Sequence, residues 1–372
     1  MAVSRINLSS EFFDRTSAKM LVQPEPQYLY AQLVFMAEAQ AQLRRAERLG
    51  VSTERAVGGM GADVPGFESV RLVLADNVRS EAIMTTDELA PGKVGHTIRF
   101  NRPIFTDSTY TEAARTVAAS SSISTEAINL TAEQTSITIK RFAGPYGASA
   151  VQPYAVDRFD AEHSVHSLAN AVGMHLARDR WKFMDTVMGG LFDTVASGYT
   201  IFPGNSNNDI TADSSAFVAS VTGSQRPFDV ETIFRAEEKL QGANIPRFAN
   251  GSYIAILSPK QVRQLRSDPA FKQLAVFDSS RNPLARSFVA SIGNVEIYVS
   301  ATNATDSSTV SGVTIQHGVM FGPSKVGYAN AGPCRVAAAN EDNYGETAKV
   351  IWLAYEGFGN LDARFAVAMH SD

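Results

Sequence analysis

The sequence predicts an α+β fold with two or three lobes. Three observations lead to this prediction. The chain has 372 residues, which is more than one compact core usually supports. Its composition, with 44% hydrophobic and 19% charged residues, is typical of a packed globular protein. Helical and strand patterns alternate in the middle of the chain, whereas strand patterns alone fill its end.

The first element is a helix predicted over residues 27–50. Apolar residues recur there every three or four positions, and three arginines followed by Gly50 suit a helix C-terminus. Two interpretations remain open at this point. The helix either docks on the protein's own core or belongs to an arm that reaches a neighbouring subunit.

Two strands, residues 97–102 and 135–142, enclose about thirty residues rich in Ser, Thr and Ala. A structureless loop of this length is unusual inside a compact domain, so we expect an extended hairpin that projects from the body. Such a hairpin is stable only when something packs against it, and we expect residues 101–134 to contact a neighbouring subunit. The candidate intersubunit contacts are Arg99, Arg102, Glu112, Arg115, Glu126, Lys140 and Arg141. Solvated surface charges are the alternative interpretation of these residues.

A long helix is predicted from an N-cap at Asp160 to about Val195, spanning roughly 50 Å. Gly189-Gly190 could kink it or end it early. A helix of this length must lie across a body or along a sheet. Its apolar stripe is formed by Val165, Leu168, Ala169, Val172, Leu176 and Phe183, and continues through Met184, Val187, Leu191 and Val195.

A small α/β lobe is predicted after residue 226. A helix starts at Asp229, a strand covers residues 252–258, a second helix starts with Pro259 at its first position, and a strand covers residues 294–301. The end of the chain is rich in strands, carried by the stretches VTIQHGVMFG, KVGYANA, CRVAAAN, AKVIWLAYEGFG and ARFAVAMH.

No motif in the sequence predicts catalysis. His163 and His166 share one side of the long helix, but His175 lies roughly 18 Å further along, and two ligands are too few for zinc. There is no P-loop, dinucleotide loop or nucleophile elbow, and Cys334 has no identifiable partner histidine. We therefore predict no catalytic, cofactor or metal site. A subunit contact that weakens as His163 and His166 become protonated is the role we consider for them.

The charge balance restricts the partners. The net charge is −5 and no block of lysine and arginine occurs, so sequence-specific DNA recognition is not expected. No apolar run resembles a signal peptide or approaches the length of a transmembrane helix, and we expect no membrane contact.

Three residue strings, together with the order of the elements, carry a resemblance to a known family. They are HLARDRWKFMDTVMGGLF with its aspartate Asp185, YIAILSPKQVRQLRSDPAF, and SFVASIGNVEIYVS. Over roughly residues 90–372 the chain resembles the major capsid proteins of tailed bacteriophages, which have the Hong Kong 97-type fold.

The resemblance implies a structural protein that assembles into hexamers and pentamers of an icosahedral virion shell around double-stranded DNA, and not an enzyme. It implies assembly in the host bacterial cytoplasm, with portal, scaffolding and possibly decoration proteins as partners. It also implies five regions: an N-terminal arm (1–66), an extended loop region (67–147), a peripheral domain with a spine helix (148–225), an axial domain (226–340) and closing strands of the peripheral domain (341–372).

Other functions remain open on the sequence alone. An encapsulin-like bacterial compartment shell would share the fold but enclose enzymes. A phage tail or baseplate component would form rings or tubes, and an α/β hydrolase would be a small oligomer with a polar pocket. Some relatives cross-link their subunits through a lysine, but the hairpin has no lysine between Lys93 and Lys140.

Overall fold

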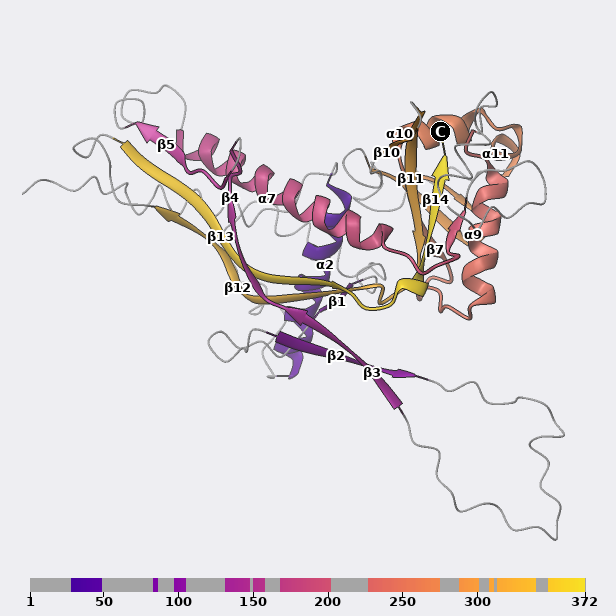
Figure 1. Cartoon of the computed structure of the whole chain (residues 1–372), viewed down its shortest axis with the longest axis horizontal. Helices are drawn as coiled ribbons and strands as arrows, with labels where there is room; N and C mark the ends of the chain where they lie inside the picture. The colour runs from indigo at the N-terminus through magenta and orange to yellow at the C-terminus, as the bar shows by residue number, and fades with distance from the viewer. Residues whose placement is uncertain are drawn as a thin grey trace, which may run out of the picture.

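The computed structural model describes residues 28–48, 83–85, 97–104, 131–147, 150–157, 168–201, 227–274, 288–300, 308–310, 313–338 and 347–371. Within these residues the strands form two sheets and a separate two-stranded hairpin (Figure 1). We call the sheet on the left of Figure 1 the long sheet and the one on the right the lobe sheet.

The long sheet is built around a pair of long antiparallel strands, β12 (Val326–Ala338) and β13 (Thr347–Asn360). The sequence stretches KVGYANA and CRVAAAN form the single strand β12, because register shifts near Gly332 let the chain pass its irregular middle without leaving the sheet. The remaining strands are β1 (Ile83–Thr85), parallel to β12, and β4 (Lys140–Gly144) and β5 (Tyr154–Asp157), both antiparallel to β13.

The lobe sheet has the described strand order β6-β14-β11-β7-β9-β8, with β10 paired to β11. Its strands are β6 (Thr200–Ile201), β7 (Tyr253–Leu257), β8 (Phe288–Ile292), β9 (Val295–Val299), β10 (Ser308–Val310), β11 (Val313–Phe321) and β14 (Ala366–Ser371), the last preceded by the 3-10 turn η4 (Ala363–Phe365).

Strand pairing differs from the predicted regions at two places. A boundary at residue 340 groups β12 with the axial domain, but β12 pairs with β13 in the long sheet. Likewise the region 341–372 was predicted to close the peripheral domain, yet β14 pairs with β11 and β6 in the lobe sheet. The chain passes between the sheets twice in this part, and hydrophobic periodicity does not report such crossings.

Three helices cover one face of the lobe sheet: α9 (Val230–Gly242), α10 (Pro259–Ser267) and α11 (Pro269–Leu274). The predicted helix starts are confirmed. The Asp229 side chain accepts a hydrogen bond from the backbone N–H of Thr232, and Ser258 and Gln261 form a reciprocal capping box with Pro259 as the first helical residue.

The lobe sheet is buried on both faces. Along β7, Tyr253, Ala255 and Leu257 pack in the core beneath α9 and α10, whereas Ile254 and Ile256 pack in the core shared with the long sheet. This alternation explains why the strand reads as a continuous apolar run in the sequence.

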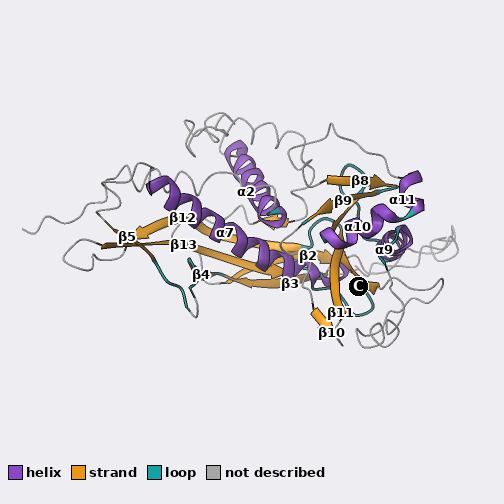
Figure 2. Cartoon of the chain, turned by 90° about the horizontal axis from the view of Figure 1, so that it is seen from above, coloured by secondary structure: helices purple, strands orange, loops and turns teal. Residues whose placement is uncertain are grey.

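The long predicted helix is α7 (Leu168–Asp193), which lies along the long sheet (Figures 1 and 2). Gly189-Gly190 does not end it, and its predicted start at Asp160 lies outside the described residues. Leu176, Met184, Met188 and Phe192 are buried, while the partly buried Phe183 ring contacts Phe142 and Trp352 of the long sheet. In the described part of the chain, no helix is both long and apolar enough to cross a bilayer.

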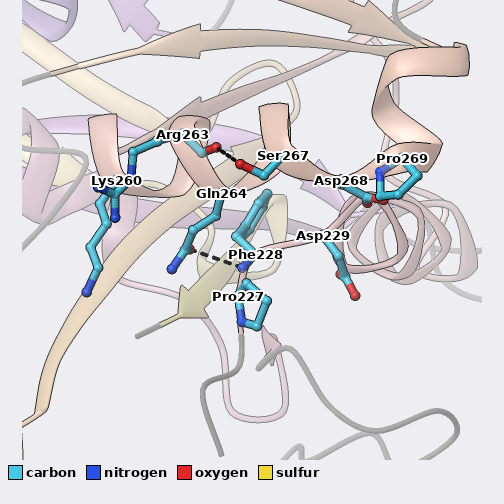
Figure 3. Close-up of a pocket in the computed structure, with 9 residues that line it drawn as sticks. All are labelled: Pro227, Phe228, Asp229, Lys260, Arg263, Gln264, Ser267, Asp268 and Pro269. Carbon is cyan, nitrogen blue, oxygen red and sulfur yellow. Dashed lines mark hydrogen bonds between the residues drawn. The ribbon is translucent and has the colours of Figure 1, made fainter.

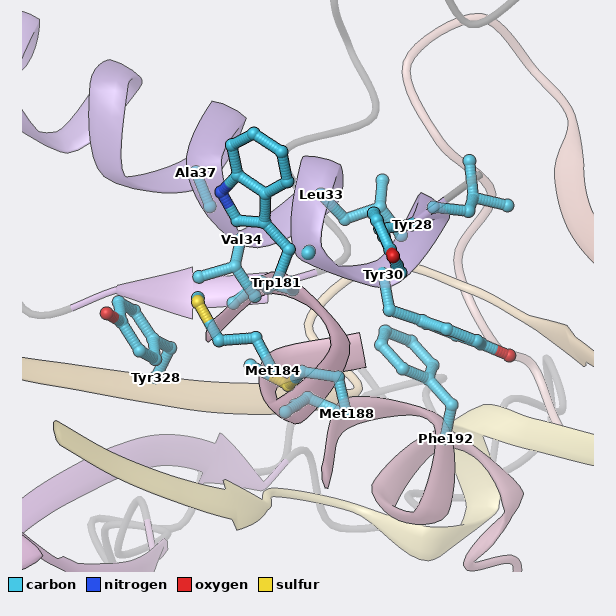
Figure 4. Close-up of a cluster of buried hydrophobic side chains, with 14 of the residues drawn as sticks. Tyr28, Tyr30, Leu33, Val34, Ala37, Trp181, Met184, Met188, Phe192 and Tyr328 are labelled. Carbon is cyan, nitrogen blue, oxygen red and sulfur yellow. The ribbon is translucent and has the colours of Figure 1, made fainter. Parts of the chain in front are cut away.

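The N-terminal helix, α2 (Leu29–Arg48), docks on the protein's own core. Figure 4 shows Leu33 and Val34 of α2 packed against Trp181, Met184 and Met188 of α7. Side chains of residues 39–48 lie outside the described set. For the described half of the helix, the first of the two predicted interpretations is therefore correct.

Asp185 joins these two helices. Its side chain is fully buried, and its Oδ1 accepts hydrogen bonds from the backbone N–H groups of Tyr30 (2.8 Å) and Ala31 (3.3 Å). The first amides of a helix have no partner within the helix, and a carboxylate there is also favoured by the helix dipole. Asp185 of α7 therefore supplies the N-cap that α2 lacks in its own sequence.

A polar network lies beneath α2. Arg180 of α7 forms an ion pair with the fully buried Glu356 of β13, and Glu38 of α2 accepts a hydrogen bond from Asn330 of β12. Burial alone would lower the pKa of Arg180, but the Glu356 carboxylate outweighs it and raises that pKa. The pKa of Glu38 is raised by burial, an effect that Arg180 partly offsets. The network thus connects both helices to the long sheet.

Candidate assembly surface

The predicted hairpin exists as two paired strands, β2 (Thr97–Ile104) and β3 (Thr131–Thr138). Their register runs antiparallel from Thr97 opposite Thr138 to Ile104 opposite Thr131. Figure 1 shows the pair lying to one side of the long sheet and pointing away from it. The stretch predicted as one strand, residues 135–142, is instead divided at Ile139 between β3 and β4, so the hairpin leads directly into the long sheet.

The base of the hairpin is fixed to the long sheet by a small apolar cluster. Ile137 is 1% exposed and Phe100 7% exposed, and both pack with the buried Ala329 of β12. Ile98, Ile139 and Leu361 complete the cluster. Arg99 and Ser136, on the opposite side of the strands, are exposed. Side chains therefore alternate along the hairpin between a face that packs on the long sheet and a face that is exposed.

Three glycines of the long sheet form the seat of Ile137. A Cβ built on Gly327, Gly357 or Gly359 would come within 2.6 to 2.9 Å of an Ile137 side-chain carbon. Gly327 lies directly opposite Gly359 in the β12–β13 ladder, and Gly357 lies two residues before Gly359. Glycine is needed at these positions because the isoleucine side chain occupies the space that a side chain would fill.

The predicted contact residues fall into two groups. Arg99 on β2 and Lys140 and Arg141 on β4 are exposed, and none of them forms an ion pair with another described residue. Arg102 faces Glu133 across the hairpin backbone, but the side chains of both lie outside the described set. Glu112, Arg115, Glu126 and the histidines His163 and His166 also lie outside the described residues.

A groove of about 650 Å³ lies on the lobe, between α10 and the residues that lead into α9 (Figure 3). Its polar groups hold the start of α9. Gln264 accepts a hydrogen bond from the N–H of Phe228, Asp268 accepts one from the N–H of Val230, and Asp229 caps the helix. Both carboxylates thus accept backbone hydrogen bonds, while Lys260 and Arg263 supply positive charge along the groove.

The junction between the two sheets contains a buried lysine. The Lys325 side chain lies just before β12, and its Nζ donates to the carbonyl of Thr194, which follows α7, and to Asn360 Oδ1 (2.9 Å) at the end of β13. Burial lowers the pKa of Lys325 to about 8. Cys334, for which the sequence indicates no partner histidine, is partly buried, and burial raises the pKa of its thiol to about 11.

We compared the chain with protein families, curated proteins and solved structures. No protein-family model matches the chain, and no curated protein does either. Solved structures match with low identity but broad coverage. The capsid of Ralstonia phage GP4 has a TM-score of 0.57 at 13% identity, covering 78% of this chain and 87% of that one. The capsid of cyanophage Pam1 has a TM-score of 0.54 at 11% identity, covering 78% and 88%. The head structure of Helicobacter pylori bacteriophage KHP40 has a TM-score of 0.51 at 13% identity, covering 78% and 86%.

The chain has the Hong Kong 97-type capsid fold. The predicted fold class is therefore confirmed, and it was carried by the order of elements rather than by any invariant motif. At identities of 11 to 13% the shared quantity is the backbone arrangement, because different side chains fill the same layers.

Several residues that matter to this Hong Kong 97-type fold were not found from the sequence. The seat of Ile137 combines residues of β3, β12 and β13, and no local pattern links them. Gly357 and Gly359 alternate near the end of β13, and glycine inside a strand is a signal in the sequence of a close approach by another segment. Asp185 was noted as a typical aspartate of the long helix, but its role as the cap of α2 depends on the tertiary structure.

Proposed function

We propose that this protein is a phage major capsid protein, whose copies assemble into hexamers and pentamers of an icosahedral shell around double-stranded DNA. The observation that carries the proposal is the Hong Kong 97-type fold, shared over 78% of the chain with the capsid of Ralstonia phage GP4. Portal, scaffolding and possibly decoration proteins would complete the particle in the host bacterial cytoplasm.

The hairpin supports this proposal independently. β2 and β3 are held to the body at their base and lie beside the long sheet rather than within it. A two-stranded ribbon is marginally stable in water by itself, so it gains most when its outer part packs on another molecule. The exposed cations Arg99, Lys140 and Arg141, together with Arg102, are proposed to form ion pairs with acidic residues of a neighbouring subunit.

The proposal is tested by imaging the purified chain by negative-stain electron microscopy, with sedimentation velocity to measure the assembled fraction. Closed icosahedral particles or hexameric and pentameric rings are the expected result. Tubes or stacked rings would favour a tail or baseplate component, and a uniform monomer with hydrolytic activity would contradict the proposal.

A second candidate, an encapsulin-like compartment shell, has the same fold and would form similar particles. Its cargo distinguishes it. Particles recovered from their natural source should contain double-stranded DNA and a single portal vertex if the capsid proposal is right. Particles filled with an enzyme and lacking DNA would instead identify a compartment shell.

A further inference from the structure

A cluster of metal-ligating side chains lies where α7 meets the lobe sheet. Asp193 is the last residue of α7, His317 is on β11 and His370 is on β14. One ligand atom from each residue lies within 4.8 Å of the other two, and all three side chains are partly buried. His317 Nδ1 is 3.0 Å from Asp193 Oδ2.

The fold brings these residues together for structural reasons. His317 and His370 are direct partners in the β11–β14 ladder, so their side chains share one face of the sheet. Val319 and Phe321 follow His317 on the same face and pack in the core that includes α7. The C-terminal end of α7 therefore lies against this histidine pair. Figure 1 likewise shows this end of the helix beside β11 and β14.

The electrostatics of the site favour a cation. The C-terminal end of a helix carries partial negative charge, and the Asp193 carboxylate adds to it. Asp193 Oδ1 is buried and has no hydrogen-bond partner among the described residues, although a buried carboxylate oxygen left without a partner is costly. The nearby Lys325 donates to the carbonyl of Thr194 and to Asn360, not to this oxygen.

We propose that Asp193, His317 and His370 bind a divalent transition-metal ion, with Zn²⁺ as the natural probe. Two imidazole nitrogens and one carboxylate oxygen are a known ligand set for zinc, with a fourth position left for water. The ion would join the end of α7 to two strands of the lobe sheet. This site is independent of the capsid proposal, because it depends on the fold of one chain and not on its assembly.

Binding requires one local change. The two imidazole rings are stacked, with centroids 3.9 Å apart and planes inclined by 22°. An ion bound to an imidazole lies in the plane of that ring, so two nearly parallel rings cannot both direct a nitrogen at it. Rotation of one ring about its Cβ–Cγ bond, without movement of the strands, would let the nitrogens converge.

The test uses the untagged chain, stripped of metal with a chelator and titrated with Zn²⁺ by calorimetry. We expect one tightly bound ion per chain and a thermal midpoint that rises with the Zn²⁺ concentration. His317→Gln, His370→Gln and Asp193→Asn should each weaken binding by more than the ~10–100-fold that is typical for loss of a residue that only supports a ligand. His175→Gln, at an exposed histidine of α7, is the matched control and should bind as the parent does.

A second measurement does not depend on the folding of any variant. Co²⁺ added to the parent chain should give the strong visible absorption of a tetrahedral site, and Zn²⁺ should abolish it by displacement. Absence of this spectrum together with absence of calorimetric binding would overturn the proposal. So would Zn²⁺ binding that persists in the His317→Gln and His370→Gln variants, or that is lost in a His163→Gln/His166→Gln variant instead.

Discussion

At the scale of single residues, the attachment of the hairpin depends on one side chain inserted against backbone. Ile137 fills the space above Gly327, Gly357 and Gly359, so the long sheet needs a stretch of surface without side chains. Close packing of this kind tolerates added atoms poorly, because neither the sheet nor the strand can move far without breaking its hydrogen bonds.

We predict that Gly357→Ala destabilises the protein by about 1–3 kcal/mol. The new Cβ would lie 2.9 Å from Ile137 Cγ2 and 3.0 Å from the backbone oxygen of Thr138, and the latter cannot rotate away. Gly190→Ala is the control, because its Cβ would meet nothing within 4 Å and alanine favours the helix by up to about 1 kcal/mol. Urea unfolding of both variants measures this, and equal stabilities would refute the packing argument.

We also predict that Asp185→Ala costs about 1–3 kcal/mol, because it leaves the amides of Tyr30 and Ala31 buried without an acceptor. Asp185→Asn keeps an oxygen at the same position and should retain more of the stability. Limited proteolysis should then cut within residues 28–48 fastest in the alanine variant. An alanine variant as resistant as the parent would show that the cap contributes little.

Capping residues illustrate what the sequence can predict at this scale. The helix starts at Asp229 and Pro259 were predicted correctly because the signals of a helix start involve residues within about four positions. The cap of α2 could not be identified, since its acceptor is 155 residues away. For the same reason the sequence did not predict the contact between His317 and Asp193, which lie 124 residues apart in the chain, and its pattern singled out His163 and His166 instead.

At the scale of elements, the junction of α7 with the two sheets is held by Lys325. Its pKa of about 8 lies below the ordinary value of 10.5 because burial penalises the charged form. Between these two values the unfolded chain binds more protons than the folded one. Stability contributed by this group therefore rises as the pH rises from about 8 to about 10.5.

We predict that this rise disappears in Lys325→Met. The difference in unfolding free energy between parent and variant should change in favour of the parent by about 3 kcal/mol across that pH range. Comparing the two proteins at each pH removes the contributions of other titrating groups. If the difference in unfolding free energy stays constant from pH 7 to pH 10.5, the pKa of Lys325 is not lowered in the folded protein.

The elements themselves were largely predictable, and their partners were not. Periodicity located α2, α9 and most strands within a few residues of their observed bounds, and it located the C-terminal end of α7 within two residues. It did not show that β12 and β14 belong to different sheets, because a strand's own pattern of apolar residues does not identify the strands with which it pairs. Pairing between distant strands is decided by tertiary packing, and local sequence patterns carry no information about that packing.

At the scale of the whole molecule, the hairpin lies below the long sheet in Figure 1, whereas the lobe lies at its right-hand end. We predict that deletion of residues 108–128 leaves a soluble, folded subunit that no longer forms closed shells. The deleted segment is poor in large apolar side chains, and ordering it costs about 1–2 kcal/mol per residue unless a neighbour supplies contacts. Circular dichroism checks folding, and electron microscopy checks assembly. Normal shells from the deletion variant would refute an intersubunit role for the hairpin.

The cap that Asp185 places on α2 has a consequence for synthesis of the chain. The ribosome makes α2 first, and the carboxylate that completes its first turn is translated 155 residues later. At about 5–20 residues per second, this interval lasts roughly 8–30 s. During that time the apolar face formed by Leu33, Val34 and Met36 has no α7 to cover it. Until α7 emerges, we therefore expect the nascent chain to expose these apolar side chains, as a segment that binds a chaperone near the ribosome would.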